Sequence, residues 1–430
     1  MQEDFIQYVW KFGLFNSLDL KTTQGKSLQI IHPGYQNFAS GPDFTNAKIK
    51  LDNQLWAGNI EIHLGKNDWN LHKHYLDPAY NNVVLHVVFA NSNTIVKTEN
   101  GRSLETLEIQ DLIYPETIQN YQNLMFSSKN NFVPCQNLVK PEPSFLLTFY
   151  DRLLAERLER KIKDIENDLE LCQGDLDKAF LIALFKYFGA PQNKVPFEVL
   201  ARNLDLSKLI KQAVSKENIE ALLFGMAGFL ETDIEDDYKI KLENEYAYLK
   251  QLYKIDSVLK YSNWKFAGTR PPNFPTIRLA QLSAVLFKEQ RWFSYIQSEN
   301  EIDKIREKLN AAPSKYWKTH YNFETASKET KKQTSDAFLD KIMINVVVPF
   351  LFYYGKFVQE EKYTERAFEI LLSLKSETNQ IIKAWKNIGF PCKSAFDSQA
   401  LISLKQDYCN EKRCLNCAIG YKILNKKKNE

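Results

Sequence analysis

The chain has 430 residues, a length that suggests two or three domains. Hydrophobic residues make up 44% of it and charged residues 25%, which is ordinary for a globular protein. The formal net charge of +3 excludes a protein-wide basic field, so any nucleic-acid binding would need a local cluster of basic residues.

The N-terminal segment lacks the basic region and the long apolar core of a signal peptide. The sequence also has no uninterrupted apolar run of about 18 residues, the length that a membrane span needs. We therefore expect a cytoplasmic protein with no membrane partner. Apolar residues from Phe5 to Phe12 recur at helical spacing, which predicts a helix over residues 2–12 that stops at Gly13.

Four strand-like runs follow this helix. They cover residues 27–32, 44–51, 55–64 and 83–90. A short helix is predicted after Asp68, which is a good N-cap residue, and before Pro78. The last run reads VVLHVVFA and is typical of a strand buried on both faces. The predicted order is αβββαβ, with a further hairpin around Asn100-Gly101.

Beyond this core the pattern changes. Prolines interrupt residues 116–143, which we interpret as a linker or an inter-domain strap. Helical stripes with charged outer faces then dominate. The fold class predicted is α+β, with four parts: an N-terminal core over 1–115, the linker over 116–143, a larger mainly helical domain over 144–390 and a cysteine-containing segment over 391–430.

The candidate catalytic and metal-binding residues lie between Asn37 and His63. Asp43 follows a proline, and after 17 further residues comes the run Glu61-Ile62-His63. Alternate side chains of a strand share a face, so Asn59, Glu61 and His63 form a polar row. Pairing of the adjacent strands would bring Asp43 close to Glu61. Two neighbouring carboxylates are costly unless a cation neutralises them, and Mg²⁺ or Mn²⁺ bound there would suit phosphodiester hydrolysis.

This arrangement, PD-x17-ExH inside an αβββαβ core, resembles the PD-(D/E)XK nuclease superfamily, whose core is restriction-endonuclease-like. The resemblance implies that Asp43, Glu61 and the carbonyl of Ile62 bind the metal, that His63 stands in the position of the catalytic lysine, and that Glu3 is the candidate for a helix glutamate. It implies a nuclease acting on DNA or RNA. A histidine supplies no permanent charge near pH 7. The alternative is therefore a non-catalytic nucleic-acid-binding or assembly protein with a degenerate nuclease fold.

Polar residues near this stretch are candidates for substrate binding. They are Asn37, Asn59, His72 and His74. On a helix, His72 and His74 would diverge, so we expect one of them, and not both, to reach the site. His86 lies in an apolar strand and is interpreted as a buried core residue.

Two further candidates for substrate binding, Arg270 and Arg278, lie in a proline-rich segment over residues 264–282. Arginine binds phosphate through two parallel hydrogen bonds and also stacks on bases. These side chains therefore either grip the substrate backbone or belong to an ordered turn in which they pair with acidic helix residues.

Cysteines gather near the C-terminus as Cys409-x4-Cys414-x2-Cys417. This spacing allows the thiolates to share a metal, either Zn²⁺ or an iron–sulfur cluster. The fourth ligand would be Cys392 or the more distant Cys135. The alternative is that the thiols are reduced packing residues.

Over almost its full length the sequence is also similar to an uncharacterised bacterial family that is known only as a domain of unknown function. The matching motifs are GPDF, WAGNIEIH, DW-x2-HKH, VVLHVV, ALLFGMAGFL, RPPNFPTIRLAQL and YCNEKRCLNCAIG. This resemblance implies no particular activity.

Overall fold

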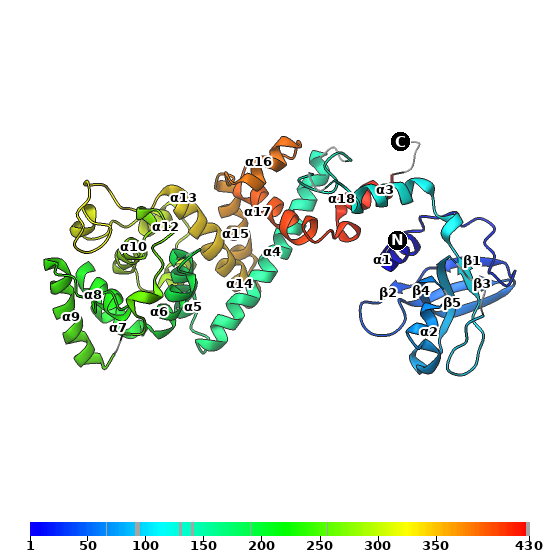
Figure 1. Cartoon of the computed structure of the whole chain (residues 1–430), viewed down its shortest axis with the longest axis horizontal. Helices are drawn as coiled ribbons and strands as arrows, with labels where there is room; N and C mark the ends of the chain where they lie inside the picture. The colour runs from blue at the N-terminus through cyan, green and yellow to red at the C-terminus, as the bar shows by residue number, and fades with distance from the viewer. Residues whose placement is uncertain are drawn as a thin grey trace. The chain divides into compact units, whose positions relative to one another are not determined.

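The protein is described by a computed structural model over residues 1–65, 67–90, 95–128, 131–138, 142–189, 191–255 and 257–426. Its contacts divide the chain into two units (Figure 1). Unit 1 consists of Met1–Phe149, Ala384–Phe390 and Ile402–Glu430, and unit 2 of Tyr150–Lys383 and Pro391–Leu401. The fold is α+β: a mixed sheet with a flanking helix is followed by a larger, mostly helical region.

Unit 1 is built on a six-stranded mixed sheet. Its strands are β1 (Leu28–His32), β2 (Tyr35–Gln36), β3 (Phe44–Leu51), β4 (Gln54–Gly65), β5 (Val83–Ala90) and β6 (Thr106–Glu108). They lie in the order β1-β3-β4-β5-β6, with β2 beside β3. The pairs from β1 to β4 are antiparallel, whereas β4–β5 and β5–β6 are parallel. The four predicted strands are thus confirmed to within two residues at their ends.

A parallel neighbour requires a crossover, and the segment between β4 and β5 provides it. It contains the one-turn helix α2 (Asp68–Leu71) and the 3₁₀ turns η1 (His74–Leu76) and η2 (Pro78–Tyr80). The predicted turn at Asn100-Gly101 is present, with one bridge between Lys97 and Ser103. The chain then joins the sheet as β6 beside β5. Part of the expected hairpin, residues 93 and 94, lies outside the described residues.

Helix α1 (Glu3–Phe12) covers the sheet and ends where predicted. Gly13 has φ of +62°, a left-handed conformation that glycine adopts without strain, and it closes the helix. The buried face of α1 includes Phe5, which stacks on Tyr121 with ring centroids 4.0 Å apart. Tyr121 belongs to α3 (Pro115–Met125), a helix that covers the first part of the predicted linker over residues 116–143. Pro115 begins this helix, because proline lacks an N–H that the first turn would leave unbonded.

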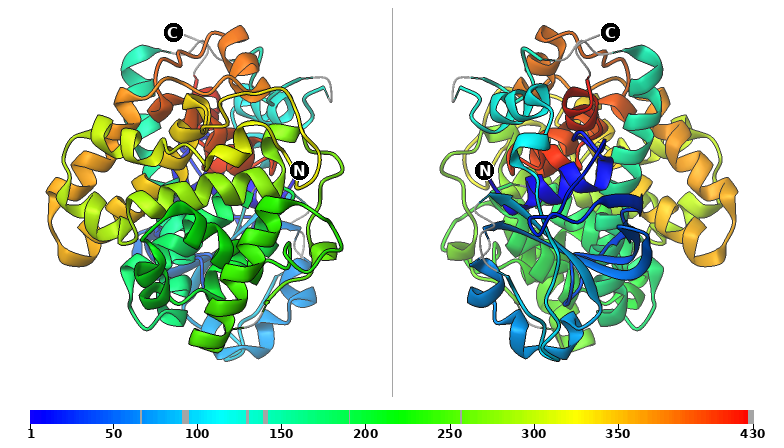
Figure 2. Two further views of the ribbon diagram at one scale, coloured as in Figure 1. Left: turned by 90° about the vertical axis from the view of Figure 1, so that its left-hand side faces the viewer. Right: turned by 90° about the vertical axis from the view of Figure 1, so that its right-hand side faces the viewer.

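The C-terminal segment Ile402–Glu430 also belongs to unit 1. Its helix α18 (Ala418–Leu424) contacts α3, and the Asn425 side chain donates to the Tyr8 hydroxyl of α1 over 3.1 Å. Figure 2 (right) shows α1 in dark blue beside the red C-terminal segment. The two ends of the chain are therefore joined in one core.

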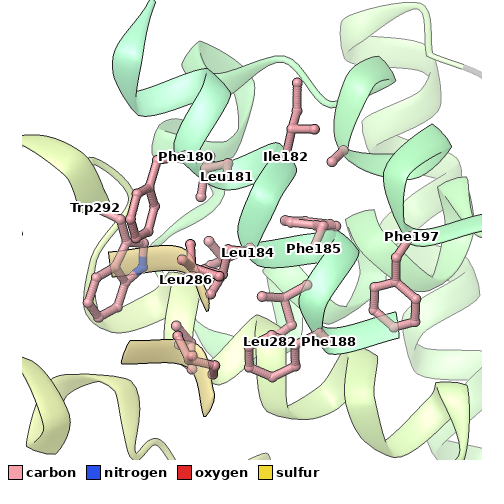
Figure 3. Close-up of a cluster of buried hydrophobic side chains, with 14 of the residues drawn as sticks. Phe180, Leu181, Ile182, Leu184, Phe185, Phe188, Phe197, Leu282, Leu286 and Trp292 are labelled. Atoms are coloured by element: carbon pink, nitrogen blue, oxygen red, sulfur yellow. The ribbon is translucent and has the colours of Figure 1, made fainter. Parts of the chain in front are cut away.

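The helical region holds most of the remaining helices, and three of them cross the boundary between the units: α4, α16 and α17. The helices are α4 (Pro143–Leu171), α5 (Leu176–Gly189), α6 (Lys194–Asn203), α7 (Leu206–Gln212), α8 (Lys216–Met226), α9 (Asp237–Tyr253), α10 (Pro275–Lys288), α11 (Trp292–Ser298), α12 (Ile302–Leu309), α13 (Asp336–Ile342), α14 (Val348–Val358), α15 (Glu361–Ser373), α16 (Gln380–Asn387) and α17 (Ala395–Ser403). Large rings such as Phe180, Phe185 and Trp292 fill the core of unit 2 (Figure 3).

The close packing of helices α8 and α9 requires a glycine at position 225. A Cβ atom there would lie 2.2 Å from the Tyr246 ring of α9, so α8 can approach only with glycine at this position.

The continuous helical run Asp336–Val358 is long and apolar enough to cross a membrane by length and composition. Its most apolar window is 61% buried within the protein, which is how the core helix of a soluble protein behaves. A π-helical turn, η7 (Met343–Val347), interrupts the run just before Pro349, whose ring cannot continue the regular hydrogen-bond ladder.

A buried carboxyl group also lies in this unit. The Glu220 side chain is completely inaccessible, and its Oε2 accepts hydrogen bonds from Trp317 Nε1 at 2.9 Å and the Tyr238 hydroxyl at 2.8 Å. Burial raises the pKa of Glu220 to about 7, although these donors favour the charged form.

We predict that Glu220 makes the free energy of unfolding fall as the pH rises. Because its folded pKa lies above its unfolded value near 4.5, the stabilisation is complete below pH 4.5 and is lost as the pH passes through about 7. The loss is on the order of 3 kcal/mol at most, since one pKa unit corresponds to about 1.4 kcal/mol. Denaturant unfolding at pH 5 and pH 8 should show a smaller pH effect for Glu220→Gln than for the wild type. Equal pH effects in both proteins would contradict this assignment.

Candidate metal centre

Two carboxyl groups meet where β3 begins beside β4. The backbone N–H of Asp43 donates to Glu61 Oε2 over 3.1 Å, and the backbone N–H of Ile62 donates to Asp43 Oδ2 over 2.9 Å. Each carboxyl group thus accepts a hydrogen bond from the backbone that carries or adjoins the other. The antiparallel pairing of β3 and β4 brings them together, as the spacing predicts.

Helix α1 supports this pair from a different part of the chain. Gln7 Nε2 donates to Asp43 Oδ1 over 2.9 Å. Glu3 lies one helical turn earlier on the same face. Burial raises the pKa of Asp43 well above its ordinary value, and the neighbouring Glu61 raises it further; burial likewise raises the pKa of Glu61. Near neutral pH, the negative charge of the two carboxyl groups must therefore be neutralised by protons or by a cation.

His63 lies between two other imidazoles. Its Nδ1 is 2.9 Å from His86 Nε2, and its Nε2 is 3.2 Å from His72 Nδ1. Burial and these neighbouring histidines lower the pKa of His63 to about 2, so the ring is neutral at pH 7. A neutral ring carries one proton. If His63 Nδ1 donates it to His86, the lone pair of Nε2 faces the carboxylates and is available to a metal.

His72 and His74 converge, contrary to the expectation from helical geometry. Helix α2 ends at Leu71, and Lys73 adopts a left-handed conformation with φ of +61°. The reversal at Lys73 turns both imidazoles to the same side. The ligand atoms of His63, His72 and His74 all lie within 4.8 Å of one another.

The separations between donor atoms match a coordination shell. Glu61 Oε1 lies 3.4 Å from His63 Nε2 and 3.2 Å from His74 Nε2. Ligands of a tetrahedral ion with bonds of about 2.0 Å are themselves about 3.3 Å apart. The His74 ring is buried, and despite its proximity to Glu61 its Nε2 forms no hydrogen bond in the described structure. A divalent cation would satisfy this nitrogen, so the residues present fit a metal ion.

Aromatic side chains hold the imidazoles in place. Tyr80 stacks on His74 with ring centroids 3.8 Å apart. Trp69 is fully buried, donates to the Lys97 carbonyl over 3.0 Å, and lies edge-on to His74 and His86. These contacts restrict the rotation of the rings and so preserve the spacing of the donor atoms.

The chain matches a protein-family model over most of its length. The family model described as a protein of unknown function (DUF2851) covers residues 3–380. The chain belongs to this family. Searches of curated proteins and of solved structures found no significant match.

The sequence did not identify three residues that support the candidate metal site: Gln7, Tyr80 and His86. Gln7 could have been found from its position four residues after Glu3 on one helix face. His86 is buried, as expected, but it contacts His63 directly and so supports the site. Nothing in the local sequence marks Tyr80 as a neighbour of His74.

Two predicted substrate-binding residues in unit 1 have other local contacts. Asn37 Nδ2 donates to the Pro42 carbonyl over 3.1 Å, and Asn37 Oδ1 accepts from the Ala39 N–H over 2.9 Å. These bonds shape the loop that leads to Asp43. Asn59 lies on β4 two residues before Glu61, and its N–H donates to the Asn82 carbonyl over 2.8 Å.

Arg270 and Arg278 belong to unit 2, where they line a cavity of about 350 Å³. Arg278 donates to the side-chain oxygens of Asn273 at 2.6 Å and Gln281 at 2.9 Å, and its guanidinium lies 3.9 Å from the centre of the Phe338 ring. Its partners are therefore amides and an aromatic ring, rather than the helix acids that the alternative interpretation expects. Burial lowers the pKa of Arg278 to about 10.

The cysteines separate into two groups. Cys135, Cys409, Cys414 and Cys417 line one small cavity in unit 1, whereas Cys392 lies in unit 2. Burial raises the pKa of Cys135 to about 12, and the nearby Cys417 and Cys414 thiols contribute to the shift. Of the two candidates for the fourth ligand, the structure thus places Cys135 beside the C-terminal three.

We predict that His72→Ala weakens binding of Zn²⁺ or Mn²⁺ at least about 10-fold, because it removes one donor from the shell. The His72 side chain is exposed, so the variant should fold. Titration calorimetry on the purified full chain measures the affinity. His320→Ala is the matched control, since His320 lies in unit 2 against Tyr316. Equal affinities for the two variants would show that His72 is no ligand.

Proposed function

We propose that this protein is a divalent-metal-dependent nuclease that hydrolyses phosphodiester bonds of DNA or RNA in the cytoplasm. The observation that supports the proposal is the convergence of Asp43, Glu61 and His63 with His72 and His74, two histidines of the β4–β5 crossover. This site occurs in an N-terminal core with the order αβββαβ, to which the short strands β2 and β6 are added.

In the proposed site, Glu61 and the three imidazoles hold the metal. A bound divalent ion would lower the pKa of a water ligand and stabilise negative charge on a phosphate. Asp43 is positioned by the Gln7 amide and the Ile62 N–H, each of which uses one lone pair of a different carboxylate oxygen. The remaining lone pairs can accept a hydrogen bond from the attacking water. Neutral His63 is fixed by His86 and cannot supply a lysine-like charge.

The donor set favours Mn²⁺ or Zn²⁺ over Mg²⁺. Imidazole nitrogen binds first-row transition metals well, whereas Mg²⁺ prefers oxygen ligands and retains several waters. The sequence alone suggests an oxygen-rich site of Asp43, Glu61 and the Ile62 carbonyl. The proximity of His72 and His74 to Glu61 supports a mixed set of nitrogen and oxygen donors.

The alternative is a non-catalytic nucleic-acid-binding or assembly protein. The burial of His63 favours it: this residue occupies the position of the superfamily lysine, yet only 1% of it is exposed, its Nδ1 faces His86 and its Nε2 lies beside His72 and Glu61. A side chain held in this way cannot contact a phosphate directly. The alternative predicts salt-sensitive binding without turnover.

We predict that the wild type cleaves labelled single- or double-stranded DNA or RNA when Mn²⁺ or Zn²⁺ is supplied. Asp43→Asn and Glu61→Gln should each lower the rate by at least about 100-fold, because each removes a charge from the metal site. Asp52→Asn is the matched control, since Asp52 lies in the β3–β4 turn and its carboxylate accepts from the Ser27 N–H.

Cleavage that survives in Asp43→Asn would rule out the assigned site. If no metal supports cleavage of any substrate by the folded wild type, the nuclease proposal fails. Salt-sensitive binding measured in the same samples would then support the non-catalytic alternative.

A further inference from the structure

Four thiols from two distant segments of the chain line one cavity in unit 1. Cys135 comes from the loop that follows α3, and Cys409, Cys414 and Cys417 come from the C-terminal segment. The cavity measures about 20 Å³, and its other walls include Leu124 and Ile419. Except for Cys409, which is half-buried, these cysteine side chains are at most 8% exposed. All six cysteines of the chain are present as thiols.

The local backbone is shaped to bring the C-terminal three together. Cys409 ends the π-helical turn η8 (Leu404–Cys409), Cys414 begins the 3₁₀ turn η9 (Cys414–Asn416), and Cys417 caps α18. The chain reverses at Lys412, which has φ of +51°. A Cβ atom at Gly420 would lie 1.9 Å from the Cys414 carbonyl oxygen, so α18 can approach this turn only with glycine there.

The four thiols come from two segments that are far apart in the sequence, and they converge on one small apolar cavity. Cysteine thiolates are soft donors that select zinc or iron–sulfur centres. The spacing Cys-x4-Cys-x2-Cys with a fourth cysteine elsewhere in the chain occurs in iron–sulfur proteins. A tetrahedral Zn²⁺ uses the same number of thiolates.

We propose that Cys135, Cys409, Cys414 and Cys417 bind a thiophilic metal centre, either Zn²⁺ or an iron–sulfur cluster, that clasps the C-terminal segment to the loop after α3. Each ligand thiol releases its proton when the centre binds. The centre is separate from the His72–His74 site, and its presence does not depend on nuclease activity.

This link between the C-terminal segment and the loop after α3 supports α1, the helix that contributes Gln7 to the histidine–carboxylate site. On α3, Asn120 Nδ2 donates to the Ile423 carbonyl of α18 over 3.0 Å. On α1, Phe12 lies edge-on to Tyr421, with ring centroids 5.0 Å apart. The same α1 carries Gln7, which holds Asp43. Loss of the cysteine centre should therefore weaken the contacts that hold α1 against the C-terminal segment.

Metal and sulfide analysis of the full chain, purified without oxygen, tests the proposal. We expect stoichiometric zinc, or iron with inorganic sulfide and a visible charge-transfer absorption; the two results distinguish the two kinds of centre. Cys135→Ser and Cys414→Ser should lose at least half of the bound metal. Cys172→Ser is the matched control, because Cys172 lies in unit 2, and it should keep its metal.

Wild-type protein with neither zinc nor iron, or Cys135→Ser with undiminished metal, would overturn the four-cysteine centre. Since His72→Ala removes a ligand of the other site alone, metal that is lost from His72→Ala and kept in Cys135→Ser would be bound at the histidines.

Two further measurements keep the proposal testable if the serine variants do not fold. In the wild type, iodoacetamide should modify the four clustered cysteines only after a chelator is added, while its reaction with Cys172 should not change. Equal reactivity with and without the chelator would contradict the centre. Removal of the metal should also speed amide exchange in α1 at least several-fold, and unchanged exchange there would refute the proposed support of α1.

Discussion

The burial of two carboxyl groups against each other, those of Asp43 and Glu61, is the constraint around which the N-terminal unit is arranged. Such a pair is unstable in an apolar environment unless hydrogen bonds, protons or a cation compensate it. The structure supplies backbone N–H groups from Asp43, just before β3, and from Ile62 of β4, an amide from α1, and imidazoles from the β4–β5 crossover. The sheet, the helix α1 that covers it and the β4–β5 crossover thus all contribute groups to the site of the two carboxyl groups. This explains why a small unit recruits residues from so many elements.

The parts of this arrangement that depend on local pattern could be predicted from the sequence. Strands β3 and β5 have the predicted bounds, because their apolar residues and their flanking turns are both strong signals. The proximity of Asp43 to Glu61 follows from the pairing of strands that are adjacent in sequence. The convergence of His72 and His74 could not be predicted, because it depends on the backbone conformation of one residue, Lys73. A lysine carries no sequence signal for that conformation.

Contacts between segments that are distant in the sequence also could not be predicted from local sequence patterns. The bond from Gln7 to Asp43 joins residues of α1 and the sheet; helical periodicity places Gln7 on the face of Glu3, but it does not identify Asp43 as the partner. For the cysteines, the sequence offered both Cys392 and the more distant Cys135 as a fourth ligand, and the placement of the two in different units distinguishes them. Because the family has no described activity and a fold does not determine function, the functional argument depends on these side-chain contacts.

The discontinuity of unit 1 also affects how the protein is made. Residues of α1 emerge from the ribosome well before the residues that pack against them, such as Tyr421 and Asn425. Domains that are continuous in sequence can fold as they emerge during synthesis. Here one side of α1 stays uncovered until the residues from 402 onward have been translated. A nascent chain that stalls before residue 402 would contain both carboxylates and all the histidines, but it would lack the partners that complete this core.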